Sequence, residues 1–305
     1  MPCGAFGQVA GMTKICVVHL VWIPLGLAQF AEFIASYREH EAGVEHDLLI
    51  IFKELEQEDQ LAAYEELLAG INYKTMFLGS EGFDLVPYFT AAKKFDYQYF
   101  CFLNSYSVIL AANWLRLMLT HLQTRGVGLV GATGSYESYY SNLLQSRPRF
   151  GVRSLPGDVR RYRHWRQMLV EAREHFEPFP NEHLRSNAFM IARELMLQIN
   201  FRGEADKMES LKFESGKEGL TRQVRALDLQ ALVVGRDGAA YAGAEWPHSH
   251  TFRSGGQRNL LVADNRTRQY AEADAPTQKF LEQCAWGSLR SESTAARNSL
   301  RETRF

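Results

Sequence analysis

Small polar residues interrupt one of the most apolar segments of the chain, and they offer a ligand site. The segment 102–110, FLNSYSVIL, is predicted to be a buried strand that carries Asn104, Ser105 and Tyr106. In an open α/β sheet, ligands bind outside the carboxyl ends of the strands. These three side chains offer hydrogen bonds but no charge, so they would make a weak site for a hard divalent cation. We therefore expect a ligand that is held with little help from a metal.

A carboxylate further along the chain has the chemistry of a general base. Glu214 lies in FESGKEG, a turn that is expected to lead into a helix over 219–227. A carboxylate at the mouth of a sheet can take the proton from an attacking hydroxyl group. The same charge would also favour the amino terminus of the 219–227 helix, by about 0.3 to 1 kcal/mol. The residues alone leave both interpretations open.

Several arginines are candidates for holding a phosphorylated ligand. A guanidinium group pairs with phosphate oxygens through a fork of N–H donors, so it can neutralise a diphosphate without a metal. Each arginine has a surface ion pair as its alternative. The candidates are Arg185, Arg222, Arg236, Arg253 and Arg266.

Strands alternate with helices along the chain, which predicts an α/β fold with a mostly parallel sheet flanked by helices. Apolar runs predict strands at 14–21, 46–52, 75–78, 102–110, 128–131, 186–192 and 231–234. Amphipathic segments predict helices at 24–40, 57–68, 85–95 and 113–124, besides the one at 219–227. Asp84 precedes the third of these helices, where it either caps the helix or contacts a ligand.

An insertion at about 138–180 interrupts this pattern, and its centre is strongly basic. Residues 147–166 carry seven arginines against one acid, Asp158, so we expect a basic helix. The rest of 12–287 is predicted to be a single domain. Residues 288–305 are polar without periodicity, which is typical of a disordered tail or a linker.

Composition narrows the class of protein. With 46% apolar and 23% charged residues the chain can bury a large core, and its formal net charge of −1 gives no global reason to expect nucleic acid as a partner. The apolar run 15–30 is broken by His19, Pro24 and Gln29, so we do not expect it to be a signal peptide or a transmembrane anchor.

Four cysteines without a CxxC pair favour reduced thiols and a cytoplasmic location. No GxGxxG, P-loop, GxSxG or HExxH motif is present.

The order of the motifs resembles that of the GT-A nucleotide-sugar glycosyltransferases, near the family 2 type. It is carried by NSYS, a helix with Trp114-Leu115, GLVG, SNAFMIARELM, FES with LTRQV, and LVV. A further set, LNSYS, TGSYES, HLRSNAFMI, ESGKEGLTRQV, VVGRDG and ADNRT, is similar to a group of bacterial glycosyltransferase-like proteins.

The resemblance implies a GT-A (Rossmann-like) fold and a function. The chain would transfer a sugar, with inversion, from a nucleotide-sugar donor, with UDP-sugars favoured, to a glycan or lipid-linked acceptor in bacterial surface polysaccharide synthesis. Glu214 falls where the family has its base. The family's Asp-x-Asp, which holds a divalent metal, is replaced here by Asn104-Ser105-Tyr106. A metal is therefore possible but its ligands are unknown, and the alternative is a catalytically silent domain that binds a sugar nucleotide or a glycan.

The resemblance also implies contacts to the donor. His19 and Trp22 end the first predicted strand, where the family packs the nucleotide base, and Asp84 would accept a hydrogen bond from the uracil or ribose. Asp237 forms either a turn or a ligand contact, and a carboxyl-terminal segment with 246–257 and 264–266 would fold over the diphosphate. The full set is His19, Trp22, Asp84, Asn104, Ser105, Tyr106, Arg185, Asn187, Arg222, Arg236, Asp237, Arg253, Asp264, Asn265 and Arg266. A further alternative, which the residues themselves suggest, is that the arginine-rich insertion contacts anionic lipids at the inner face of the membrane or the phosphates of a nucleic acid.

Overall fold

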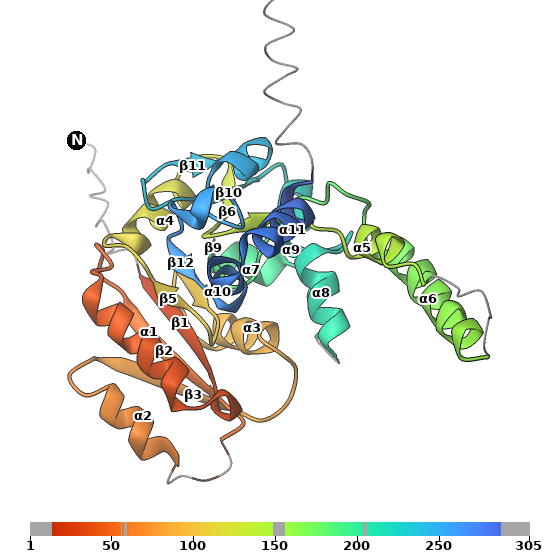
Figure 1. Ribbon diagram of the computed structural model, residues 1–305. Helices are drawn as coiled ribbons and strands as arrows, with labels where there is room; N and C mark the ends of the chain where they lie inside the picture. The colour runs from red at the N-terminus through yellow and green to blue at the C-terminus, as the bar shows by residue number, and fades with distance from the viewer. Residues whose placement is uncertain (1–13, 56, 58–59, 149–155, 204–205, 288–305) are drawn as a thin grey trace, which may run out of the picture.

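The computed structural model describes residues 14–287, apart from 56, 58–59, 149–155 and 204–205. The predicted domain start at residue 12, the predicted tail at 288–305 and two arginines of the insertion, Arg149 and Arg153, lie outside these residues. Figure 1 shows a twisted sheet covered by helices, with one helical arm that projects from the body.

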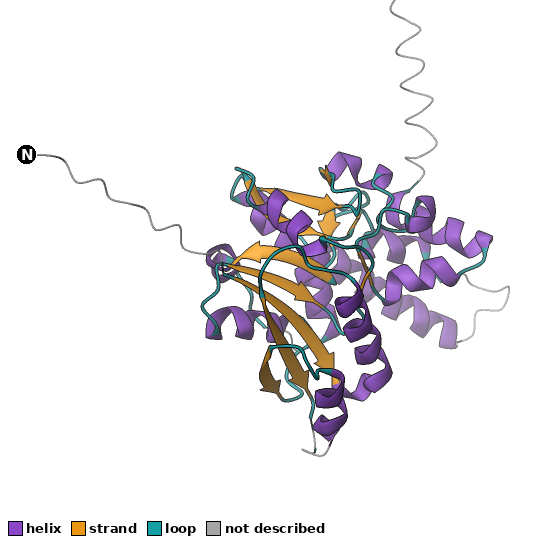
Figure 2. Cartoon of the chain, turned by 90° about the vertical axis from the view of Figure 1, so that its left-hand side faces the viewer, coloured by secondary structure: helices purple, strands orange, loops and turns teal. Residues whose placement is uncertain are grey.

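Within this part of the chain, eight strands form one sheet in the order β11-β10-β6-β9-β4-β1-β2-β3. Six of them run parallel, whereas β9 and β11 are antiparallel to their neighbours. This confirms the predicted α/β class and mostly parallel sheet, which Figure 2 shows from the side. The strands are β1 (Ile15–Trp22), β2 (Asp47–Lys53), β3 (Tyr73–Leu78), β4 (Tyr99–Leu103), β6 (Val127–Gly131), β9 (Ala188–Ala192), β10 (Gln230–Val234) and β11 (Ala240–Tyr241).

Short strand pairs connect the carboxyl-terminal segment to this sheet. Strand β5 (Val108–Ile109) pairs with β12 (Val262–Ala263), and β7 (Gly134–Ser135) pairs with β8 (His183–Leu184). The described residues include the 3₁₀ turns η1 (Ile23–Leu25), η3 (Gly243–His248) and η4 (Gly255–Gln257). The pairing of β5 with β12 brings residues 261–263 beside the segment that follows β4.

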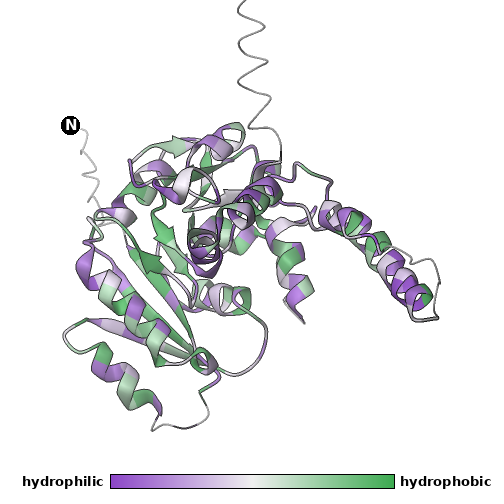
Figure 3. Cartoon of the chain, viewed as in Figure 1, coloured by the Kyte–Doolittle hydropathy of each residue, from purple (hydrophilic) through white to green (hydrophobic). Residues whose placement is uncertain are grey.

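Helices bury both faces of the sheet because the strands are apolar on both sides. One face packs against α1 (Leu27–Glu39), α2 (Leu61–Leu67) and α4 (Trp114–Leu122). The other packs against α3 (Leu85–Lys94), α7 (Arg193–Gln198), α8 (Lys207–Ser215), α9 (Leu220–Ala226) and α11 (Ala275–Trp286). The apolar residues accordingly gather in the strands and on the inner faces of these helices (Figure 3). Helix α10 (Asn265–Glu272) follows β12 directly.

The arm consists of α5 (Tyr139–Gln145) and α6 (Pro156–His175), so the basic helix predicted in the insertion is present. The two helices are joined to each other and to α8 by a small apolar cluster that includes Leu143, Ala172 and Phe176. No helix in the described ranges combines the length and the apolarity needed to cross a bilayer.

Candidate functional site

A polar turn follows β4 directly, and it corrects the predicted strand over 102–110. The strand ends at Leu103, and Asn104 begins a turn in which its Oδ1 accepts from Tyr106 N and Ser107 Oγ, both at 3.1 Å. Asn104 N donates to Asn187 O at 2.9 Å, which places the turn beside the start of β9. Because β9 runs antiparallel to β4 and β6, its first residues lie at the carboxyl ends of those strands. Asn104 and Asn187 therefore share the edge at which a ligand is expected.

A buried hydrogen-bond network extends from Asn187 along this edge. Asn187 Oδ1 accepts from Thr133 Oγ1 at 2.8 Å, and Arg185 Nη1 donates to the same hydroxyl at 3.4 Å. Arg185 Nη2 lies 2.6 Å from Asp264 Oδ2 in an ion pair whose side chains are 11% and 0% exposed. Burial alone would raise the pKa of Asp264, but the Arg185 charge and the hydrogen bonds from Arg185 and Thr267 hold it below its usual value.

A second arginine lies beside Arg185. The guanidinium carbons of Arg185 and Arg253 are 4.4 Å and 4.9 Å from the centre of the Phe252 ring. Arg253 Nη1 donates to Glu137 Oε2 at 3.2 Å. Burial lowers the pKa of Arg253, and the charges of Arg185 and Arg266 lower it further. The charge of Glu137 raises this pKa and so opposes the shift. An arginine nevertheless stays protonated in proteins, so two positive groups face the same ring.

Glu214 is fixed at this edge by one residue. Its Oε2 accepts from Ser186 N at 2.7 Å and from Ser186 Oγ at 2.5 Å, and Ser186 lies between Arg185 and Asn187. We predicted that Glu214 lies in the turn before the 219–227 helix. The structure corrects this, because Glu214 belongs to the last turn of α8. Only residues 216–219 separate α8 from α9, and the Glu214 carboxylate accepts its hydrogen bonds from Ser186 of another segment, which favours the site interpretation over a charge that serves the start of α9.

His183 contributes a buried imidazole near Glu214. Its Nδ1 lies 2.8 Å from Asn181 O, and its side chain is buried. Burial lowers the pKa of His183, while the charge of Glu214 opposes that shift.

Three buried donor groups at this edge have no partner among the residues that the structure describes. They are Ser105 Oγ, Asn187 Nδ2 and Arg253 Nε. A buried donor without an acceptor costs about 1 to 3 kcal/mol. Each of the three is a donor that an oxygen acceptor on a ligand would satisfy.

The two residues predicted to contact the nucleotide base at the end of β1, Trp22 and His19, differ in their exposure to solvent. Trp22 is the last residue of β1, is 38% exposed, and donates from Nε1 to Glu54 Oε2 at 3.0 Å. The prediction for His19 is wrong, because its ring is fully buried three residues earlier and stacks on Phe33 at 3.6 Å. Asp84 stands at the position before α3 but forms no capping hydrogen bond from its side chain.

The remaining predicted residues divide into structural and exposed positions. Arg222 Nη2 donates to Asn181 Oδ1 at 3.0 Å, and Asp237 accepts from Ala239 N and Tyr241 Oη in the β10–β11 turn. These two side chains are thus engaged in local structure. Tyr106 is half-buried, and the exposed positions are Arg236, Asn265 and Arg266.

Sequence reasoning missed Thr133, Glu137, Ser186 and Phe252, which connect the predicted residues to one another. It also missed Lys53, a nearly buried lysine at the end of β2 that forms an ion pair with Glu54 at 3.6 Å. Of these missed residues, Lys53 had a signal in the sequence, because a lysine ends an otherwise apolar predicted strand there.

The side chains at this edge do not fit a divalent metal. Asn104 Oδ1 already accepts two hydrogen bonds, Asp264 is paired with Arg185, and Glu137 is paired with Arg253. Among the residues described, no cluster of three or more His, Cys, Asp or Glu side chains has metal-binding geometry. A hard cation prefers several carboxylate or carbonyl oxygens that are free to coordinate it.

No protein-family model and no curated protein matches the sequence. Solved structures that resemble the chain include a mannosyltransferase, a glucosyl-3-phosphoglycerate synthase and TarS. A mannosyltransferase from Pyrobaculum calidifontis, solved with GDP-Man and Mn²⁺, is 11% identical, with 92% of this chain and 70% of that chain covered and a TM-score of 0.45. Glucosyl-3-phosphoglycerate synthase from Mycobacterium tuberculosis, solved with Mn²⁺, UDP and phosphoglyceric acid, is 13% identical, with 64% and 61% covered and a TM-score of 0.37.

Residues 1–349 of TarS from S. aureus are 15% identical, with 39% of this chain and 34% of that chain covered and a TM-score of 0.32. The chain thus spans 70%, 61% and 34% of these three proteins. These identities and TM-scores are too low to transfer a substrate or a mechanism to this chain.

Proposed function

We propose that this protein is a glycosyltransferase that moves a sugar from a nucleotide-sugar donor to an acceptor hydroxyl group. The observation that carries the proposal is the combination, on one sheet edge, of a fixed carboxylate, two adjacent buried arginines and three donors without acceptors. A donor diphosphate supplies many oxygen acceptors, and an acceptor hydroxyl supplies a proton for the carboxylate.

In the proposed reaction, Glu214 is the general base. The acceptor oxygen attacks the anomeric carbon and forms the new glycosidic bond while its proton passes to Glu214. The bond between the anomeric carbon and the phosphate oxygen breaks, and the nucleoside diphosphate leaves with that electron pair. Attack on the face opposite to the leaving group inverts the anomeric centre. Ser186 holds Glu214 in one position, so it is a positioning residue.

The proposed diphosphate site uses arginine in place of a metal. Arg253 Nε and Asn187 Nδ2 donate to phosphate oxygens, and the guanidinium groups of Arg185 and Arg253 offset the charge that develops on the leaving group. Arg266 is exposed beside Arg253 and adds a third positive charge.

The donor base is proposed to lie at the ends of β1 and β2. Trp22 offers an exposed indole face there, and Lys53 and Glu54 offer polar groups. A UDP-sugar is our preferred donor. We further propose a glycan or lipid-linked acceptor, a role in bacterial surface polysaccharide synthesis, and a cytoplasmic location.

Nucleotide release tests this function. The protein is incubated with UDP-glucose, UDP-galactose, UDP-N-acetylglucosamine and GDP-mannose, with and without mixed glycan or lipid-linked acceptors, and free UDP or GDP is measured. We expect release from one donor, including slow release to water when no acceptor is present. Binding of a nucleotide without any release by the wild-type protein would support a silent binding domain instead.

A further inference from the structure

The distal half of α6 carries arginines that lack acidic partners. Arg160, Arg163 and Arg166 are exposed and form no ion pair with any residue in the described ranges. Arg161, by contrast, is paired with Asp158, the one acid in this half of the helix. Three positive charges are therefore left without local compensation.

The proximal half of the same helix differs in charge. It carries Glu171 and Glu174, and Glu171 lies 3.5 Å from Lys212 of α8. The basic character is thus confined to the end of the arm that projects farthest from the body (Figure 1).

One face of α6 is used for packing and the opposite face is open. Trp165 Nε1 donates to Leu143 O at 2.8 Å, and Ala172 and Phe176 are buried against Leu143. Side chains at spacings of four, three and four residues share a helix face. Val159, Arg163, Arg166 and Val170 have these spacings on the open side, and the two valines are 40% and 68% exposed.

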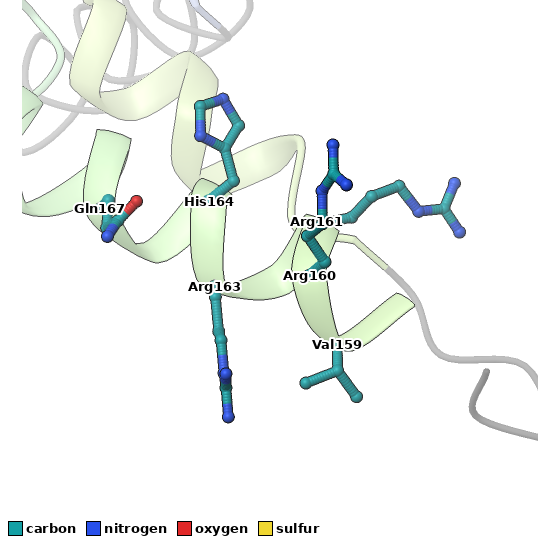
Figure 4. A pocket seen from close by; sticks show the side chains of 6 residues that line it. All are labelled: Val159, Arg160, Arg161, Arg163, His164 and Gln167. Atoms are coloured by element: carbon teal, nitrogen blue, oxygen red, sulfur yellow. The ribbon is translucent and has the colours of Figure 1, made fainter. Parts of the chain in front are cut away.

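The side chains of Arg160, Arg161 and Arg163 spread apart instead of meeting at one point. These three arginines line an open hollow of about 930 Å³ together with Val159, His164 and Gln167. Figure 4 shows Arg163 and Val159 directed to one side of the helix, and Arg160 and Arg161 directed elsewhere. A single small anion would need converging donors, so this arrangement suits an extended negative surface.

We propose that the open face of α6 binds the surface of an anionic lipid bilayer. Arg163 and Arg166 lie at the level of the lipid phosphates, with Arg160 at the edge of this face, while Val159 and Val170 enter the boundary between headgroups and acyl chains. A nucleic acid would use the arginines but would leave both valines in water, so the exposed valines favour the bilayer. The inference depends on the arm alone and not on the donor site.

Sedimentation with vesicles tests the proposal on the full chain. Vesicles of phosphatidylcholine with 30% phosphatidylglycerol, a composition chosen for the test, are compared with pure phosphatidylcholine and with a 30-base-pair DNA duplex. We expect binding to the anionic vesicles only, and release when the salt concentration is raised. A basic residue near such a surface contributes about fivefold to partitioning, so Arg160→Gln/Arg163→Gln/Arg166→Gln should lower it by about 100-fold.

Two further variants test whether binding depends on the open face of α6 or only on the overall charge of the protein. A folding control is included for all variants. Arg116→Gln/Arg125→Gln/Lys279→Gln removes the same charge from exposed positions outside the arm and should leave partitioning within about threefold of wild type. Val170→Gln should weaken binding even at low salt, where the arginine contribution is strongest. Equal thermal unfolding of all variants shows that each is folded. Equal losses in the two triple variants, or binding to the duplex but not to vesicles, would overturn the proposal.

Discussion

Ser186 donates both its backbone N–H and its hydroxyl group to the same oxygen, Oε2, of Glu214, at 2.7 Å and 2.5 Å. One carboxylate oxygen is thereby held, and Oε1 is not engaged in that contact. If Glu214 is the base, Oε1 is the atom that takes the proton from the acceptor.

Replacing the carboxylate by an amide tests that role. Glu214→Gln keeps an oxygen that can accept from Ser186, so the fold and the nucleotide affinity should be unchanged. The transfer rate should fall by about 10²- to 10⁴-fold, the usual contribution of a general base. Glu209→Gln, on the same helix and paired with Lys212, is the control and should retain full activity. Wild-type turnover in Glu214→Gln would remove this residue from the mechanism.

The arginine pair is tested by comparing ligands with and without phosphate. Arg253→Gln removes the unpartnered Nε donor and one positive charge beside Arg185. Affinity for UDP should fall by about 10- to 100-fold, since a charged hydrogen bond contributes about 1.5 to 3 kcal/mol. Affinity for uridine should not change. Arg225→Gln, which breaks an ion pair with Glu182 instead, serves as the control. Equal losses for UDP and uridine would mean that Arg253 acts through structure alone.

The buried ion pair between Arg185 and Asp264 predicts a large effect on stability. Asp264→Asn keeps a residue that caps α10 well but leaves the Arg185 charge buried without its partner. The free energy of unfolding should fall by about 3 to 5 kcal/mol in urea titrations. Asp274→Asn changes the corresponding cap of α11, where no ion pair exists, and should have little effect. Similar small effects in both variants would show that the pair is not important for stability.

The buried position of His19 leads to a prediction of how the free energy of unfolding depends on pH. Burial lowers the pKa of His19 from 6.5 to about 3. Because the unfolded chain binds a proton that the folded chain does not, stability is lost as the pH falls below 6.5, by about 1.4 kcal/mol for each unit down to about pH 3. His19→Leu should therefore flatten the decline between pH 7 and pH 5 in urea titrations. His248→Leu, at an exposed position, should decline as the wild type does. An unchanged slope in His19→Leu would contradict this assignment.

The fold was predictable because its signals are local. Continuous apolar runs such as DLLIIF identify strands that are covered on both faces, and β2 lies within one residue of its predicted bounds. The antiparallel direction of β9 was not predictable, since it depends on the path of the arm that precedes it. That direction is what brings Arg185, Ser186 and Asn187 to the carboxyl edge.

The site was predictable only in part. Glu214, Arg185, Arg253 and Asn187 were selected from the sequence, and the structure brings them to one edge. Their geometry depends on long-range contacts, such as those of Ser186 with Glu214 and of Phe252 with both arginines, which no local pattern signals. His19 failed for a related reason, because its burial is decided by Phe33 of another element.

Calorimetric titration of the wild-type protein with UDP in EDTA, repeated with Mn²⁺, tests the central claim most directly. If Arg185, Arg253 and Asn187 hold the diphosphate, UDP should bind in EDTA with a Kd in the micromolar range, about −8 kcal/mol. Added Mn²⁺ should then change the affinity by less than about threefold, or about 0.6 kcal/mol. The absence of UDP binding in EDTA, with tight binding restored by Mn²⁺, would contradict a site built on arginine.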